Sequence, residues 1–193
     1  MLDALFLDTL WDFDDPHGSE ERLRAVLDSP ETPGGDRPEL ATQVARALGL
    51  QEKFDEAGSL LESVDEGAYG DPDAGPAIRV RTLLERGRLR NSAGHTDAAV
   101  PLFEEAIRRA HEAGLDFLEV DALHMLAIAD LPRAALWTER GLAAVDSASG
   151  TAAERARIQR WRVSLSNNMG WAFHDAGDFE SALAQFQQAA RAA

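Results

Sequence analysis

The chain has 193 residues, of which 45% are hydrophobic and 27% charged, and it contains no cysteine. This length is enough for one domain with a sizeable core, and the composition is that of an ordinary globular protein. The lack of cysteine excludes disulfides, thiolate zinc sites and cysteine nucleophiles. The formal net charge of −15 argues against nucleic-acid binding, because that binding depends on attraction to the phosphate backbone.

The first residues argue against a secretory signal. Residues 1–8 have no basic region, and Asp3 and Asp8 interrupt their apolar run. No stretch approaches the roughly 20 apolar residues needed to cross a membrane. We therefore expect a cytoplasmic protein that does not bind a membrane.

An N-terminal helical cap is predicted for residues 1–37. Residues 3–11 have a short amphipathic pattern, which the acidic stretch before Pro16 ends, because proline disfavours helical geometry in the preceding residue. Ser19 is the predicted N-cap of a second helix that runs to about Asp28. A loop rich in proline and glycine follows at 29–38.

Four stretches with helical periodicity follow, and each predicts a helical hairpin: 38–66, 77–113, 115–147 and 152–193. A second loop, over 65–76, separates the first two. Gly94-His95 marks the turn of the second hairpin, and Pro132 is expected at the first position of a helix in the third. The last hairpin is predicted to open with one long helix over 152–176.

Small and large apolar residues recur in a fixed order in the last hairpin. Met169-Gly170, Phe173, Ala182 and Phe186 have the separations of the tetratricopeptide pattern. The other hairpins match this pattern more loosely, through Val44-Ala45, Ala57 and Leu61, through Gly87, Ala99 and Phe103, and through Leu126-Ala127 and Ala134. Over about residues 39–190 the chain therefore resembles the tetratricopeptide repeat (TPR) family, including bacterial TPR proteins whose activity is uncharacterised.

The resemblance implies one all-α domain, a right-handed α-α superhelix (TPR-like solenoid) of about four hairpins after the N-terminal helices. Gly170 and Ala182 are expected to let the last two helices approach closely. A bulky residue at either position should then overpack the hairpin, at a cost of about 1 to 3 kcal/mol.

The sequence does not favour catalysis. The five histidines are scattered and none has a zinc-ligand spacing, and no phosphate-binding glycine loop or nucleophile elbow occurs. We expect a protein that is not an enzyme and has no catalytic, cofactor-binding or metal-binding residues.

Partner binding is the predicted function, and the resemblance implies where it occurs. In TPR proteins the first helix of each hairpin lines a concave groove, which here gives a candidate set of partner-binding residues: Arg46, Arg81, Arg88, His124, Asn167, Asn168 and Trp171. Asparagine amides would bind the backbone of a peptide, and arginines would pair with its acidic side chains. In the alternative interpretation, Arg81 and Arg88 pair with Glu85 and nearby acids, and Trp171 packs between helices.

The family's carboxylate clamp for chaperone tails is not reproduced at these positions, so that function is not supported. A second arginine-rich stretch surrounds Trp161, and it could suggest single-stranded nucleic acid. Its arginines would wrap around a helix, however, so docking on the acidic N-terminal half is favoured: Arg155, Arg157, Arg160 and Arg162.

Self-association is the alternative function. TPR arrays commonly end in a solvating helix, and no such helix follows the last hairpin before Ala193. The apolar face of Leu183 and Phe186 would then need a cover. Either a homodimer formed through this hairpin supplies it, or the chain is part of a longer protein.

Overall fold

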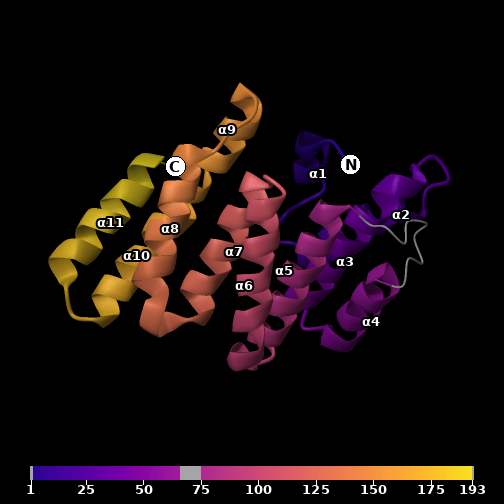
Figure 1. The fold of residues 1–193 in the computed structure, drawn as a ribbon. Coiled ribbons are helices and arrows are strands. Elements are labelled where there is room, and N and C mark those ends of the chain that lie inside the picture. Colours follow the sequence, from indigo (N-terminus) through magenta and orange to yellow (C-terminus); the bar gives the residue numbers. More distant parts are fainter. Residues whose placement is uncertain (1, 66–74, 193) are drawn as a thin grey trace. The chain divides into compact units, whose positions relative to one another are not determined.

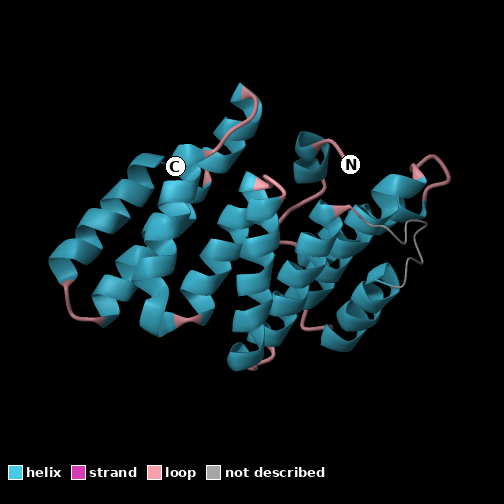
Figure 2. Ribbon diagram, viewed as in Figure 1, coloured by secondary structure: helices cyan, strands magenta, loops and turns pink. Residues whose placement is uncertain are grey.

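The computed structural model describes residues 2–65 and 75–192, and all regular structure in this part of the chain is helical (Figures 1 and 2). The predicted loop over 65–76 lies almost entirely outside the described residues. Contacts between residues group the chain into two compact units, Met1–Ala99 (unit 1) and Val100–Ala193 (unit 2). The helix α6 (Thr96–Glu112) begins in unit 1 and ends in unit 2.

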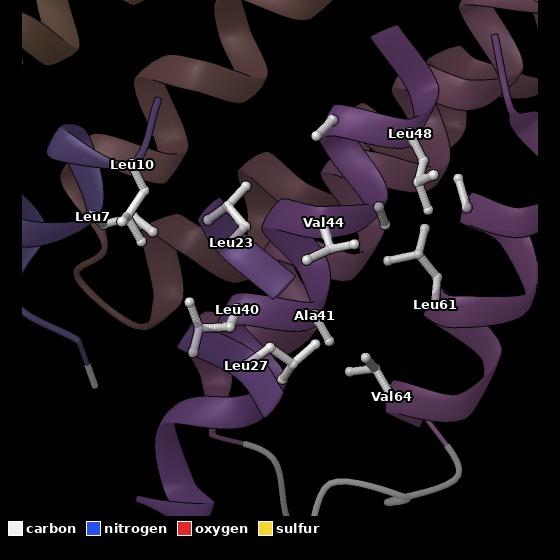
Figure 3. Close-up of a cluster of buried hydrophobic side chains, with 13 residues drawn as sticks. Leu7, Leu10, Leu23, Leu27, Leu40, Ala41, Val44, Leu48, Leu61 and Val64 are labelled. Carbon is white, nitrogen blue, oxygen red and sulfur yellow. The ribbon is translucent and has the colours of Figure 1, made fainter. Parts of the chain in front are cut away.

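Unit 1 is built around one central helix. The helix α3 packs against α2, α4 and α5. Figure 3 shows leucine and valine side chains from α2 and α4 converging on α3, and two leucines of the N-terminal segment complete this core. The helices of unit 1 are α1 (Ala4–Thr9), α2 (Pro16–Asp28), α3 (Arg37–Leu50), α4 (Phe54–Asp65) and α5 (Pro76–Ser92).

Unit 2 contains two helical hairpins. The helix α10 packs against its partner α11 and also against both helices of the preceding hairpin, α7 and α8. In unit 1, α5 packs against both α3 and α4 in the same way. This recurrence confirms the predicted all-α fold of helical-repeat type. The helices are α7 (Asp116–Ala129), α8 (Ala134–Ser147), α9 (Ala152–Gln159), α10 (Trp161–Asp175) and α11 (Phe179–Ala192).

Glycines permit the close approach of helices in unit 2. A Cβ atom at Gly141 on α8 would lie 2.8 Å from Leu165 Cδ2 on α10, and one at Gly170 on α10 would lie 2.5 Å from the ring of Phe186 on α11. Ala182 on α11 is buried. The small residues of the last hairpin therefore have the packing role that their spacing predicts.

Three element boundaries differ from the prediction. Asp15, not Ser19, caps α2, because its carboxylate accepts a hydrogen bond from the Gly18 amide and Pro16 takes the first helical position. The long helix predicted over 152–176 is divided into α9 and α10 at Arg160. Pro132 lies in a short 3₁₀ turn, Leu131–Arg133, that precedes α8.

The turn between α3 and α4 has a strained residue. Glu52 has φ of +61°, whereas glycine occupies the positive-φ positions of the turns at Gly94, Gly114 and Gly177. A side chain disfavours this left-handed conformation because Cβ crowds the following carbonyl oxygen. We expect Glu52→Gly to stabilise unit 1 by about 0.5 to 1 kcal/mol, measured by urea unfolding. Glu52→Ala should not reproduce this gain in stability, because alanine also has a Cβ atom. Equal stability of the two variants would show that the positive φ at this position is not strained.

Glu20 joins α2 to the same turn. Its carboxylate lies 2.7 Å from Arg24 Nε, 2.8 Å from Gln51 Nε2 and 3.1 Å from Lys53 Nζ. Desolvation raises the pKa of Glu20, but the hydrogen bonds from Arg24, Gln51 and Lys53 outweigh it and lower the pKa from 4.5 to about 2.

This lowered pKa predicts a pH dependence of stability. A carboxylate with a depressed folded-state pKa stabilises the fold above its unfolded-state pKa, and this contribution is lost as the pH falls from 4.5 towards 2. Glu20→Gln should cost about 1 kcal/mol at pH 7 and flatten the loss of stability over that range. Thermal melts of the unaltered protein and the variant between pH 6 and pH 2.5 measure this pH dependence. Parallel profiles of melting temperature against pH would contradict the lowered pKa of Glu20.

Candidate functional site

The α3 face in unit 1 is already covered by the N-terminal segment of the same chain. The Leu2 amide donates a hydrogen bond to Glu39 Oε2 at 3.0 Å, and the Trp11 indole donates one to Gln43 Oε1 at 3.1 Å. The predicted site residue Arg46 stacks on two rings, with its Cζ 5.5 Å from the ring centroid of Trp11 and 5.2 Å from that of Phe13. The groove positions of the first hairpin therefore bind residues of their own chain.

The two predicted arginines of α5 are in ion pairs. Arg81 Nη2 lies 2.8 Å from Glu39 Oε1, and only 14% and 3% of the two side chains are exposed. Arg88 Nη1 lies 2.5 Å from Glu85 Oε1, also in a largely buried pair. Burying a charge is costly unless it is paired, so both arginines have a structural role within unit 1.

In unit 2 the structure brings His124 and Asn168 together. Asn168 Nδ2 on α10 lies 3.0 Å from His124 Nδ1 on α7, so an amide and an imidazole bridge the first helices of two consecutive hairpins. Both side chains are partly exposed. This bridge fixes the orientation of two polar groups at the surface.

A stack of aromatic rings begins at His124. The ring centroid of Trp161 lies 5.2 Å from that of His124 and 5.7 Å from that of Phe117. The guanidinium carbon of Arg157, on α9, lies 3.6 Å from the centroid of Phe117. A cation on the face of an aromatic ring is an attractive arrangement, and the stack links α9 to α7.

Asn167 and Trp171 extend this surface along α10. Asn167 is exposed, and 53% of Trp171 is accessible to solvent. One edge of Trp171 contacts Phe186 on α11, at 5.4 Å between ring centroids. We refer to His124, Trp161, Asn167, Asn168 and Trp171 as the α7–α10 face.

The α7–α10 face contains one residue that the sequence did not assign to it. The sequence groups Trp161 with the surrounding arginines, as a site for nucleic acid or for docking. It precedes Asn168 by two helical turns, just as Phe117 precedes His124, so the same spacing places all four on corresponding stripes of α10 and α7. That spacing is the signal that could have identified Trp161.

The α7–α10 face offers an amide, an imidazole and an indole as hydrogen-bonding groups with apolar ring surfaces beside them. This combination suits the backbone amides and apolar side chains of a peptide. Among the described residues, no three His, Asp or Glu side chains come together in a way that could hold a metal ion. No helix of the described residues is both long and apolar enough to cross a membrane.

Comparison with known proteins gives no family. No protein-family model and no curated protein matches the chain. Its structure is similar to the crystal structure of BtubC (BKLC) from P. vanneervenii, with 18% sequence identity and a TM-score of 0.40, covering 96% of this chain and 90% of the other. A likeness of this degree identifies neither a family nor a function.

Proposed function

We propose that the protein is a non-catalytic, TPR-like scaffold of the cytoplasm that binds a protein or peptide through the α7–α10 face. The observation that supports this proposal is the His124–Asn168 bridge, which orients two polar side chains of α7 and α10, with the partly exposed ring of Trp161 against His124. Such groups can satisfy the backbone of an extended or helical peptide, while Trp161 and Trp171 bind its apolar side chains.

This proposal changes the kind of partner that the sequence suggested. Arg81 and Arg88 are engaged in largely buried ion pairs, so they give little support to an arginine-lined groove for acidic side chains. The exposed members of the α7–α10 face are Asn167 and Trp171. The proposed ligand is therefore a peptide recognised through its backbone and an apolar side chain.

A selection of displayed peptides on the immobilised full-length protein tests the proposal. Tryptophan is among the residues that most often dominate the binding energy of an interface. Trp171→Ala should therefore lower the affinity for the selected peptides by about tenfold or more, and Asn167→Ala should lower it by less. Leu136→Ala is the matched control, because it removes another exposed apolar side chain, from α8. Unchanged affinity in the Trp171 and Asn167 variants, or an equal loss in the control, would contradict the proposal.

Self-association through α11 is a second candidate, because this helix has a large exposed apolar surface. Phe179 and Leu183 lie one turn apart, and 64% and 58% of their surfaces are exposed. Light scattering over a range of protein concentrations tests self-association. A dimer that Leu183→Glu converts to a monomer would support it. A monomer at all concentrations would exclude it.

A further inference from the structure

Within unit 1, the segment Trp11-Asp12-Phe13 is bound to α2 and α3 as a peptide ligand would be. We name this segment the clasp. The ring planes of Trp11 and Phe13 are parallel to within 10°, with centroids 5.0 Å apart, and the guanidinium of Arg46 contacts both. The indole N–H of Trp11 is bound by Gln43. Both aromatic side chains of the clasp are therefore recognised by α3.

The backbone of the clasp is recognised by α2. The buried Ser19 hydroxyl accepts a hydrogen bond from the Asp12 amide and donates one to the Asp12 carbonyl, at 2.8 and 2.9 Å. Arg22 Nε donates to the carbonyl of Leu10, the residue before the clasp, at 3.1 Å. Side chains and backbone are thus bound by different helices, and the bound segment enters a turn that the Asp15 amide closes on the Asp12 carbonyl.

The clasp differs from the helix that precedes it in how firmly it is held. Leu7 and Leu10 belong to the buried core of unit 1 and Trp11 packs against that core, whereas 59% of Phe13 is exposed. A ring stacked on a guanidinium at a partly exposed site is held only weakly. The Phe13 ring is therefore the part of the clasp that is held least firmly.

We propose that Gln43 and Arg46 form an interaction surface for an acidic segment with two aromatic residues separated by one, and that the clasp is its resident occupant. Aromatic faces and carboxylates are both attracted to a guanidinium, and the clasp offers both, because Asp12, Asp14 and Asp15 flank its rings. A partner segment of this chemistry replaces the two rings of the clasp on α3. This surface is separate from the α7–α10 face, so each can be tested without the other.

The probe is a fluorescent synthetic peptide with the sequence of residues 8–15, measured by anisotropy with full-length protein. The double variant Trp11→Ala, Phe13→Ala vacates the surface, so it should bind the peptide about tenfold more tightly than the unaltered protein, in which the clasp competes. Adding Arg46→Ala should abolish the gain. Adding Arg86→Ala, on α5, should leave it unchanged.

Equal binding of the peptide by the unaltered and double-variant proteins would overturn the proposal, as would a gain that survives the loss of Arg46. A peptide with both aromatic residues replaced by alanine should not bind. If the double variant does not fold, the unaltered protein decides: excess peptide should shift the ¹⁵N–¹H indole signal of Trp11, and an unmoved signal would refute the exchange. Signals of Trp161 and Trp171 report the α7–α10 face separately.

Discussion

Replacing Arg81 by methionine is expected to destabilise unit 1 by about 3 to 5 kcal/mol, because it leaves a buried carboxylate without its cation. The Glu39 side chain is 3% exposed, and its other oxygen accepts a hydrogen bond from the Leu2 amide. Methionine fills a similar volume, so the loss reflects the charge rather than a cavity. Urea unfolding at pH 7 measures it through the midpoint and slope.

Arg86→Met on the same helix is the matched control. Arg86 Nη2 lies 2.7 Å from Asp65 Oδ2, a similar distance, but the two side chains are 36% and 46% exposed. Exposed pairs contribute about 0 to 1 kcal/mol, so this variant should be almost as stable as the unaltered protein. Similar losses in the two variants would contradict the assignment of Arg81 as a buried structural cation and favour its role as a solvated groove residue.

Replacing Gly170 by leucine is expected to destabilise the last hairpin by about 1 to 3 kcal/mol through overpacking. Carbon atoms of the Phe186 ring lie 2.5 and 2.6 Å from the position of a Cβ at Gly170, closer than any real contact allows. The helices must then separate or the ring must turn away. Thermal unfolding followed by near-ultraviolet circular dichroism measures the loss.

Gly58→Leu is the control for the substitution itself. Gly58 also lies within a helix, α4, but nothing lies within 4 Å of a Cβ at that position. Leucine is a better helix former than glycine by up to about 1 kcal/mol, so this variant should be stabilised. Combining Gly170→Leu with Phe186→Ala should recover part of the loss, and a fully additive double variant would show that the two residues do not clash.

The packing of the last hairpin could be predicted because its signals are local in sequence. Gly170 and Phe186 are sixteen positions apart, on two helices joined by a short turn, and their spacing places them face to face. The division of α9 from α10 at Arg160 could not be predicted in this way, because Arg160 keeps helical dihedral angles and no proline or glycine marks the boundary. The helix α9 packs on α7 and α8, and no local pattern in the sequence predicts these contacts.

The candidate site was less predictable, because most of its contacts are long-range. Arg46 was assigned to a groove from its repeat position, but its ring partners precede it by more than thirty residues and no periodicity connects them. The pairing of Arg81 with Glu39 joins two hairpins, so sequence spacing could not distinguish a ligand-binding arginine from a structural one. The His124–Asn168 bridge is also long-range, but both residues were found because each is at a groove position of its hairpin.

The four tryptophans allow one measurement to test where a partner binds. The indoles report three regions: Trp11 the clasp on α3, Trp137 the buried side of α8, and Trp161 and Trp171 the α7–α10 face. A peptide obtained by selection on the full-length protein is added to ¹⁵N-tryptophan-labelled protein. If the α7–α10 face binds the peptide, the indole signals of Trp161 and Trp171 shift while that of Trp137 stays in place. A bound peptide that leaves the signals of both Trp161 and Trp171 unmoved would contradict binding at this face.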